Sequence, residues 1–397
     1  MKAILIIPDR PYLLNQKSLP HLGCLYLVYV LKENGYEVEI LDFADGWRFV
    51  EADFYGISIV TPDFLRAKEI LKWLKEKGAE RVTAGGPHVS ICPQESLDAG
   101  FDKVSIGDGE LTIQKLAIAK GEKVIEGWAK NIDDFYPDRK AIDLWQYEFY
   151  INNVRATPMM TARGCIWGKC AFCCRWDKGI RFCSIQHIKR EIQEIADIGF
   201  RAIMIYDDEF FAFPKRDLQI ARLLKKYGMT WRCFSRSDLI LRNKELIKFA
   251  AKNGLREVLI GVESANDEIL KSIEKGTSVE MNKEAIKFLH SSGINVKCAM
   301  IVGLPGENEK SLEKMWQFCE EVEPYTYDFD FTIYAPLPES KIWKNPENYD
   351  ISFDKNYLPY KTKPNEYKCM VRTKNLSGEE LLLWRKNLEK RFKKILR

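Results

Sequence analysis

Residues 163–174 read RGCIWGKCAFCC, and this stretch places three well-spaced cysteines in one short loop. Cys165 and Cys170 are separated by four residues, and Cys170 and Cys173 are separated by two. Thiolates at this spacing can converge on one inorganic centre, where they hold three irons of a four-iron cluster and leave the fourth iron open. The spacing therefore predicts an iron–sulfur cluster at this loop.

The sequence on either side predicts how the loop is carried. Residues 158–162 form a short extended run that reaches a tight turn at Gly164. After the cysteines, residues 184–199 repeat apolar side chains at helical spacing: Ile185, Ile188, Ile192, Ile195 and Ile198. The local order is therefore strand, cysteine loop, helix.

This arrangement resembles the signature of the radical S-adenosylmethionine (SAM) superfamily. The usual signature has three residues between the first two cysteines, whereas this chain has four, a longer gap that also occurs in the superfamily. The resemblance implies that Cys165, Cys170 and Cys173 ligate a 4Fe-4S cluster, and that SAM chelates the open iron through its amino and carboxylate groups. It also implies that Phe172 lies against the adenine.

Composition limits the other classes of protein. The 397 residues are enough for two domains, each with its own core. The formal net charge is only +4, which argues against a nucleic-acid partner. We find no run of about twenty apolar residues, and the start breaks at Pro8 and Asp9, which argues against a membrane span or a secretory signal. Eleven cysteines, four of them within ten residues, fit a metal site in a reducing compartment, so a cytoplasmic location is expected.

Strands and helices alternate over roughly the first 115 residues. Strands are expected at residues 3–7, 37–41, 55–60, 81–84 and 103–106, with helices at 22–34 and 65–77. Such alternation predicts a doubly wound α/β sheet, in which ligands bind beyond the carboxyl ends of the strands. Small residues and glycines follow several of these strands. They would let a large flat ligand approach the backbone, although glycines also simply form turns.

Together these strand ends resemble the cobalamin-binding domain that precedes many radical SAM barrels. The resemblance implies that cobalamin contacts come from Leu22, Gly23, Ser58, Thr61, Pro62, Asp63, Gly85, Gly86, His88, Gly107, Gly109 and Glu110. The loop after the first strand lacks an Asp-x-His-x-x-Gly motif, so no histidine from that motif can ligate cobalt. The lower face of the cofactor would then meet the loop at residues 61–64. His88 either contacts a cofactor tail or makes a local turn contact.

The second half repeats strand and helix units and resembles the barrel of the radical SAM family over residues 158–340. Six units predict an open, partial (β/α)6 barrel. Asp207 and Asp208 follow one strand and need cations or hydrogen-bond donors, since uncompensated buried charges are costly. The resemblance implies SAM contacts from Asp207, Asp208, Arg236, Glu263, Ser264, Gly303 and Pro305. Glu263 would accept the ribose hydroxyls, and the turn at Gly303 and Pro305 would approach the adenine.

The expected organisation is an α/β chain of four parts. Residues 1–130 form a Rossmann-like cobalamin-binding domain and residues 131–155 a linker, interpreted as a connector packed over the second domain. Residues 156–340 form the radical SAM partial barrel, and residues 341–397 a C-terminal extension on the substrate side. Residues 378–397 read as a basic surface helix packed on the barrel.

The resemblance implies a function as well as a fold. A reduced cluster with SAM generates a 5′-deoxyadenosyl radical that abstracts hydrogen, and methylcobalamin can then deliver a methyl group. We therefore predict a cobalamin-dependent radical SAM methyltransferase acting at an unactivated carbon of a peptide, a protein or a small metabolite. Its electron donor would be a ferredoxin or a flavodoxin.

Several alternatives remain open. The first is a radical cyclisation, rearrangement or oxidation without methyl transfer. A methylthiotransferase would need a further cysteine trio in the first domain, which contains only Cys24 and Cys92. A corrinoid or electron carrier would explain one domain at a time and would leave the motifs around Asp208 and Glu263 without a purpose.

Overall fold

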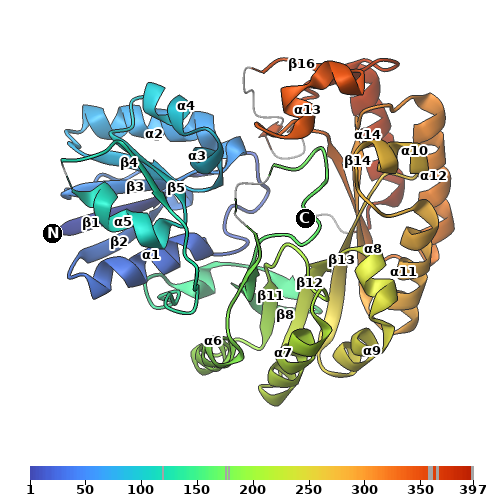
Figure 1. The fold of residues 1–397 in the computed structure, drawn as a ribbon, viewed down its shortest axis with the longest axis horizontal. Helices are drawn as coiled ribbons and strands as arrows, with labels where there is room; N and C mark the ends of the chain where they lie inside the picture. Colours follow the sequence, from blue (N-terminus) through green and yellow to red (C-terminus); the bar gives the residue numbers. More distant parts are fainter. Residues whose placement is uncertain (119, 175–176, 178, 356–360, 364–365, 395–397) are drawn as a thin grey trace. The chain divides into compact units, whose positions relative to one another are not determined.

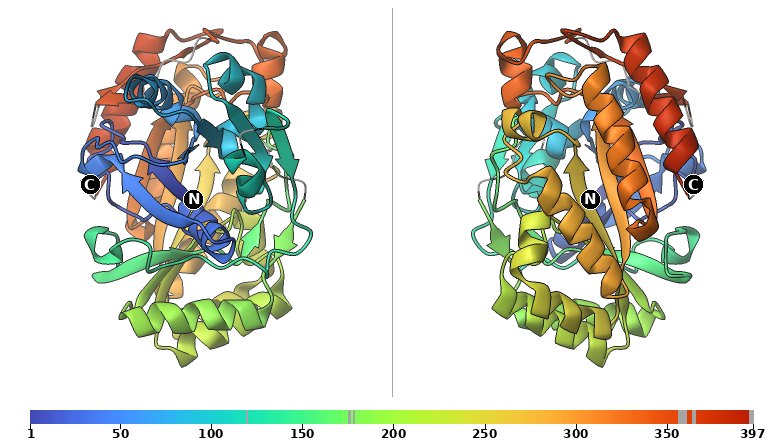
Figure 2. Two further views of the ribbon diagram at one scale, coloured as in Figure 1. Left: turned by 90° about the vertical axis from the view of Figure 1, so that its left-hand side faces the viewer. Right: turned by 90° about the vertical axis from the view of Figure 1, so that its right-hand side faces the viewer.

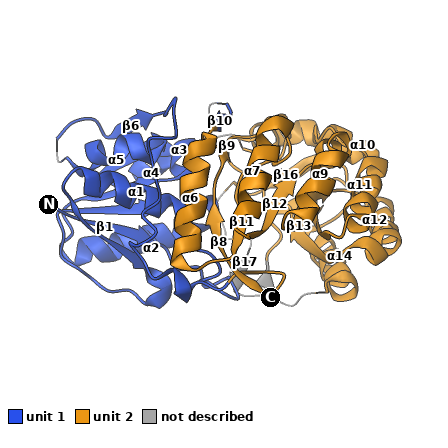
Figure 3. Cartoon of the chain, turned by 90° about the horizontal axis from the view of Figure 1, so that it is seen from below, with its two compact units in different colours: residues 1–148, 176–181, 357–366 blue, residues 149–175, 182–356, 367–397 orange. Residues whose placement is uncertain are grey.

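The computed structural model describes residues 1–118, 120–174, 177, 179–355, 361–363 and 366–394. The chain divides into two compact units, which Figure 3 shows in different colours. Unit 1 contains residues 1–148, 176–181 and 357–366. Unit 2 contains residues 149–175, 182–356 and 367–397. Each unit is built around its own mainly parallel sheet.

Unit 1 has a six-stranded sheet in which every strand pair is parallel. The strand order is β2 (Glu37–Asp42), β1 (Lys2–Ile7), β3 (Phe54–Ser58), β4 (Val82–Gly85), β5 (Lys103–Gly107) and β6 (Val124–Gly127). The helices of this unit are α1 (Leu22–Glu33), α2 (Phe64–Glu76), α3 (Pro87–Ile91), α4 (Pro93–Asp98) and α5 (Gly109–Ala117). Figure 1 shows these helices around the blue strands.

A core between the sheet and α2 holds unit 1 together. Strand residues such as Ile4 and Ile57 are buried against Phe64 and Ile70 of α2. Each fully buried aliphatic or aromatic side chain stabilises the fold by about 1.5–3 kcal/mol. The strands read as continuous apolar runs because both of their faces are covered. Packing thus fixes the carboxyl ends of β3, β4 and β5 at one edge of the sheet.

Unit 2 has a seven-stranded sheet with the order β15 (Asp328–Ile333), β14 (Asn295–Val302), β13 (Leu255–Glu263), β12 (Thr230–Ser235), β11 (Ala202–Ile205), β8 (Val154–Met159) and β7 (Tyr150–Ile151). In this sheet, β8 and β11 to β15 pair in parallel, whereas β7 pairs with β8 in an antiparallel hairpin. This sheet is the expected curled partial barrel of six parallel strands, with one added hairpin strand. The predicted α/β fold class is therefore confirmed.

Helices cover the outer face of this barrel, and the right-hand view of Figure 2 shows those coloured yellow and orange. The helices of unit 2 are α6 (Ile185–Ile198), α7 (Pro214–Lys226), α8 (Ser237–Arg242), α9 (Lys244–Lys252), α10 (Asp267–Ser272), α11 (Val279–Ser291), α12 (Glu309–Val322), α13 (Lys341–Lys344) and α14 (Gly378–Phe392). The remaining strands are short: β9 (Ala162–Arg163), β10 (Arg181–Phe182), β16 (Ile351–Phe353), β17 (Lys361–Lys363), β18 (Glu366–Tyr367) and β19 (Val371–Thr373).

The inner face of the barrel is unusually charged. Side chains alternate between the two faces along a strand, and the outer face of β15 carries Phe329 and Phe331, which contact Phe392 of α14. Asp328 and Asp330 therefore face inward, where both pair with the buried Lys297. Arg232 and Glu257 form a second buried ion pair 2.5 Å apart on neighbouring strands. Because each of these charges has a partner, the barrel can bury them.

The connector and the C-terminal helix are the two remaining segments of the expected organisation. The sequence favoured packing of the connector over the second domain, but the connector contacts unit 1 instead. Asp138 pairs with Lys32, and the Tyr147 hydroxyl donates to Asp42. The C-terminal helix packs on the barrel as expected, because Arg385 Nε donates to the carbonyl of Phe331. Residues 395–397 of that expected helix lie outside the described residues. Within the described part of the chain, no helix combines the length and apolar character needed to cross a membrane.

Candidate functional site

The cysteine loop begins directly after β9, and a buried carboxylate holds its entry. Asp207, at the end of β11, accepts hydrogen bonds from the backbone N–H groups of Thr161 at 2.6 Å and Ala162 at 3.0 Å. Burial raises the pKa of Asp207 to about 6, although these hydrogen bonds oppose the shift. Asp207 therefore fastens the strand that leads into the loop. Asp208, the next residue, is exposed. Burial raises the pKa values of the Cys165 and Cys173 thiols, and the charge of Asp208 adds a smaller contribution in the same direction.

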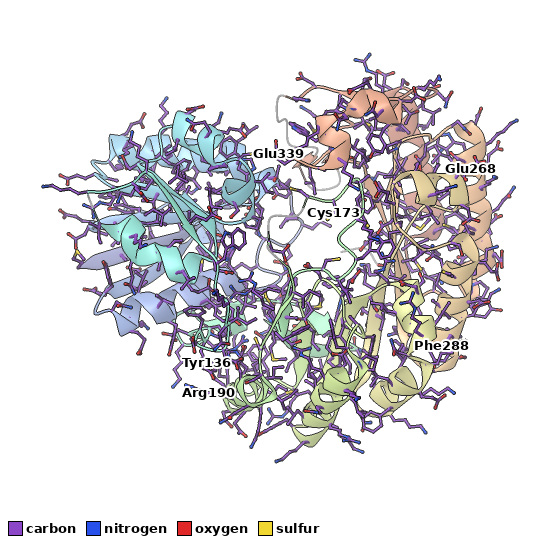
Figure 4. All side chains as sticks on the ribbon, viewed as in Figure 1. Tyr136, Cys173, Arg190, Glu268, Phe288 and Glu339 are labelled. Atoms are coloured by element: carbon purple, nitrogen blue, oxygen red, sulfur yellow. The ribbon has the colours of Figure 1, made fainter. Side chains whose placement is uncertain are left out.

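The three thiols of the loop lie within electrostatic reach of one another, and none of them forms a disulfide. Burial, followed by the neighbouring Cys170 and Cys165, raises the pKa of Cys173 to about 12. The Sγ of Cys165 accepts a hydrogen bond from the Gly168 N–H at 3.4 Å. Cys165 and Cys170 are partly buried and Cys173 is exposed at the surface of the loop. Thiols this close together form a donor set that a positively charged iron centre would stabilise as thiolates. The residues present therefore fit a cluster. Figure 4 labels Cys173 on this loop.

Two cations lie beside the thiols. Burial raises the pKa of Cys170, whereas Lys275 and Arg236 lower it. Lys275 Nζ is 2.7 Å from Glu263 Oε1, and both side chains are almost completely buried. Burial alone would lower the pKa of Lys275, but the Glu263 carboxylate raises it above its ordinary value. The cluster loop, Lys275 and the expected ribose-binding residue Glu263 thus form one connected group.

The backbone of β13 is shaped to hold this ion pair. Its register against β14 shifts between Gly261 and Glu263, and Glu263 has a φ of +63°. A side chain at Gly261 would place its Cβ 2.3 Å from Glu263 Oε1 and 2.7 Å from Lys275 Nζ. A non-glycine residue with positive φ is uncommon and costs free energy. The strand end therefore makes room for Glu263 and Lys275 at the expense of local strain.

The remaining predicted SAM residues lie on neighbouring strand ends. Arg236 Nη1 donates to the carbonyl of Lys275 at 2.8 Å, and Phe172 has the Lys275 ammonium 6.0 Å from its ring centroid. Ser264 is buried directly after Glu263. Beyond β14, the N–H of Gly303 donates to Glu307 Oε2 at 2.6 Å and closes the turn that contains Pro305. The structure thus brings Phe172, Arg236 and Glu263 together around Lys275.

Glu307 is buried within that turn. Burial raises its pKa to about 8, although hydrogen bonds from the Gly303 and Leu304 N–H groups oppose the shift. Its second oxygen, Oε1, has no hydrogen-bond partner among the residues that the structure describes. Its main role in the structure is to hold the backbone of the turn at the end of β14.

In unit 1, only some of the predicted cobalamin residues present accessible groups. Ser58 and Gly85 are paired at the ends of β3 and β4, and both are half-buried, as are Thr61, Pro62 and Gly86. A Cβ at Gly85 would make only an ordinary 3.4 Å contact with Ser105. Neither packing nor backbone conformation therefore requires a glycine at this position. The bare strand end fits a large ring that lies against the backbone.

Other predicted residues of unit 1 are engaged within the protein. Asp63 is buried and accepts hydrogen bonds from Arg10 and from the Tyr12 hydroxyl. His88 is buried, its ring lies 4.3 Å from that of Phe64, and burial lowers its pKa to about 4. This geometry favours the local turn contact for His88. Glu110 and Leu22 are also buried, whereas Gly23 is exposed.

Two predicted glycines are required by the protein's own atoms. A Cβ at Gly86 would lie 2.8 Å from the Ile59 carbonyl oxygen, and one at Gly107 would lie 2.2 Å from the Gly127 carbonyl oxygen. These two positions need no ligand to explain them, which distinguishes them from Gly85. A Cβ at Gly109 would lie 2.9 Å from the end of the Leu27 side chain, which can move aside.

Sequence reasoning missed two residues of unit 2. Lys275 follows a short helix and precedes a glycine, a position where lysines are usually solvated. Trp167 lies inside the gap between the first two cysteines. The extra residue in that gap was the only available signal for Trp167, and Lys275 gave none.

Comparison with protein families agrees with the two halves of the chain. The profile of the radical SAM superfamily matches residues 159–319, and that of the B12 binding domain matches residues 16–117. The chain contains a radical SAM domain and a B12-binding domain. Radical SAM domains are catalytic, so the chain is an enzyme. The two domains imply a 4Fe-4S cluster, SAM and cobalamin as cofactors, and the radical SAM domain implies that the enzyme needs a reductant.

The chain is similar to curated proteins along most of its length. It is 26% identical to an uncharacterized methyltransferase of Pyrococcus horikoshii, over 91% of this chain and 86% of that protein. It is 27% identical to the anaerobic magnesium-protoporphyrin IX monomethyl ester cyclase of Rubrivivax gelatinosus, over 74% of this chain and 58% of that protein.

Solved structures share the fold of this chain. The methyltransferase TsrM of Kitasatospora setae, solved with cobalamin and a [4Fe-4S] cluster, has a TM-score of 0.70 at 15% identity, with 91% of this chain and 82% of that chain covered. The cobalamin-dependent SAM radical enzyme OxsB has a TM-score of 0.68 at 19% identity. That match covers 87% of this chain and 55% of OxsB.

Proposed function

We propose that the chain is a cobalamin-dependent radical SAM methyltransferase that transfers a methyl group to an unactivated carbon of a peptide, a protein or a small metabolite. The observation that carries the proposal is that the three cysteines share one loop in which Cys170 lies near Lys275, Arg236 and Glu263, in a chain that also has a B12-binding domain. When bound, the cluster and SAM supply a hydrogen-abstracting 5′-deoxyadenosyl radical, and cobalamin supplies the methyl group.

The residues of unit 2 would act by ligation, charge and position. Cys165, Cys170 and Cys173 would ligate the cluster, and the cations at Lys275 and Arg236 would favour the thiolate form of Cys170. Glu263 would accept the ribose hydroxyls of SAM, and Lys275 would orient that carboxylate. The remaining SAM contacts would come from Phe172, Asp208, Ser264 and the turn that contains Gly303 and Pro305.

In unit 1, we assign cobalamin to the carboxyl ends of β3 and β4. Ser58 and Thr61 would provide hydroxyl groups, and Gly85 would provide close approach to the backbone. Since Asp63 and His88 are buried among protein partners, neither is assigned a contact with the ring. The domain limits proposed from sequence, 1–130, 131–155, 156–340 and 341–397, are retained for the design of variants.

A direct test measures metals and SAM products together. The protein is purified without oxygen after expression with cobalamin, and iron and cobalt per chain are determined. It is then reduced with dithionite in the presence of SAM, without added substrate. We expect 5′-deoxyadenosine from radical cleavage, and S-adenosylhomocysteine in proportion to bound cobalamin, because reduced cobalamin accepts the methyl group of SAM.

The same experiment separates the alternatives. A radical cyclisation or oxidation is the second candidate, because the cyclase of Rubrivivax gelatinosus is as similar to this chain as the methyltransferase relative. Formation of 5′-deoxyadenosine without S-adenosylhomocysteine, in protein that contains cobalt, would favour it. S-adenosylhomocysteine without 5′-deoxyadenosine would refute a radical mechanism. A small iron–sulfur or flavin protein is the proposed electron donor.

A further inference from the structure

Trp167 is the large side chain within the four-residue gap between Cys165 and Cys170, and it is docked on the turn that follows α10. Its indole N–H donates to the carbonyl of Glu274 at 2.8 Å. The edge of its six-membered ring lies on Gly276, where an added Cβ would be 2.1 Å from Trp167 Cζ2 and 2.4 Å from Cη2. Gly276 therefore forms a notch that the tryptophan fills.

Further contacts fix the same turn to the cluster loop. The guanidinium carbon of Arg236 lies 4.4 Å from the centre of the Trp167 ring, a distance that allows a cation–π interaction. Arg236 also donates from Nη1 to the carbonyl of Lys275 at 2.8 Å. Beyond Cys170, the N–H of Ala171 donates to the carbonyl of Ile273 at 2.8 Å. The turn at residues 273–276 is thus tied to the loop on both sides of Cys170.

This turn also carries Lys275, whose ammonium group pairs with Glu263. A displacement of the turn would therefore move the charge beside Cys170 and the carboxylate at the end of β13. A loop with one more residue than the usual signature has more conformations to lose when its cysteines converge. A docked aromatic ring offsets that cost because it fixes the middle of the gap.

We propose that Trp167 is a positioning residue: by filling the notch at Gly276, it sets the geometry of the long gap and holds the cysteines in register with the Lys275–Glu263 pair. This inference rests on the proposed ligation of a cluster by the three cysteines. It concerns how the chain accommodates the fourth gap residue, and it assigns no contact between Trp167 and SAM.

The test compares two glycine variants. Gly276→Ala would drive a methyl group into the indole ring, whereas Gly293→Ala would meet no atom within 4 Å. The two positions have similar φ angles, +71° and +75°, so both variants carry similar backbone strain. Each full-length protein is reconstituted with iron and sulfide, and we measure iron per chain, the electron paramagnetic resonance spectrum with and without SAM, and the thermal midpoint.

We expect Gly276→Ala to lose most of its iron, or to show an altered spectrum that no longer responds to SAM. Gly293→Ala should keep its iron and the SAM-dependent change, with a similar shift in thermal midpoint. In a Trp167→Phe background, the smaller ring leaves room for the new methyl group. Gly276→Ala should therefore cost much less iron in that background than in the wild-type chain.

Equal iron content and equal spectra in the two glycine variants would overturn the inference, as would full additivity of Gly276→Ala and Trp167→Phe. If Gly276→Ala fails to fold, Trp167→Leu supplies the test, since it removes the ring without adding an atom to the turn. Trp167→Leu with normal iron and a normal SAM response would also overturn it. Failure of the proposed cluster ligation is distinct, because wild-type protein would then take up no cluster. Failure of the proposed methyl transfer alone would leave the iron content of the wild-type protein unchanged.

Discussion

The parallel sheets of the two units both end in acidic and glycine-rich turns, but the polar groups at these ends have different partners. In unit 1, Asp63 binds Arg10 and Tyr12, groups that hold the chain's own loops in place. In unit 2, Glu263 pairs with Lys275, which lies beside the thiol of Cys170. An acidic residue after a strand can therefore serve either packing or chemistry. The two cases differ in the cation that pairs with the carboxylate and in the group next to that cation, which is the Cys170 thiol in unit 2.

The largest effect is expected when one thiol of the cysteine loop in unit 2 is removed. Cys170→Ala should abolish cluster assembly and all 5′-deoxyadenosine formation, because two cysteines cannot hold three irons. Iron analysis and product chromatography measure both effects. Cys319→Ala is the matched control: this buried cysteine lies on α12, outside the loop, and its variant should keep its iron. Radical product from Cys170→Ala would remove the cluster from the mechanism.

The next effect tests the buried ion pair of unit 2. Lys275→Met leaves Glu263 without its partner, and breaking a buried pair in this way costs about 3–5 kcal/mol of unfolding free energy. Denaturant titration measures this loss. Lys287→Met removes an exposed partner of Glu321 and should cost less than about 1 kcal/mol. Equal losses in the two variants would show that the Lys275–Glu263 pair has no special importance.

In unit 1, adjacent glycines should respond differently. Gly86→Ala should destabilise the protein by more than about 1–2 kcal/mol, since its φ of +103° is unfavourable for alanine and the new Cβ would meet the Ile59 carbonyl oxygen. Gly85→Ala should leave stability nearly unchanged and lower the cobalt retained per chain. Thermal unfolding and cobalt analysis measure these effects. Unchanged cobalt in Gly85→Ala would argue against a ligand at the end of β4.

The most gradual expected effect is a pH dependence from Glu307, because it is spread over several pH units. Its pKa is raised to about 8 in the folded chain, so between about pH 4.3 and 8 the folded chain holds a proton that the unfolded chain releases. Stability should therefore fall as pH rises through this window, by at most about 1.4 kcal/mol per pH unit. Glu307→Gln should reduce this slope, whereas Glu309→Gln, at an exposed position, should leave it unchanged. A slope that Glu307→Gln does not alter would assign the dependence to other groups.

Much of both sheets could be predicted from the sequence, because apolar runs and glycine turns are local signals. The cysteine spacing is a local signal as well, and ligation of a cluster by these cysteines stays a prediction. The Lys275–Glu263 pair could not be predicted, since it joins residues whose proximity depends on a strand bulge at Gly261. Nor could sequence separate Gly85 from Gly86, because only packing shows which glycine the protein itself requires.

The end of β11 carries two acidic residues whose different environments follow from their adjacency. Asp207 is turned to the buried side and fastens Thr161 and Ala162, while Asp208 is exposed toward solvent near the thiols. Consecutive side chains of an extended chain point to opposite faces. If Asp207 points to the buried side, Asp208 must therefore point to the exposed side. Deletion of a single residue from this strand would bring Asp208 to the buried position and Glu209 to the exposed one, whereas an insertion would bring Tyr206 to the buried position, which has no carboxylate. The number of residues in β11 therefore decides whether Asp207 can hold Thr161 and Ala162.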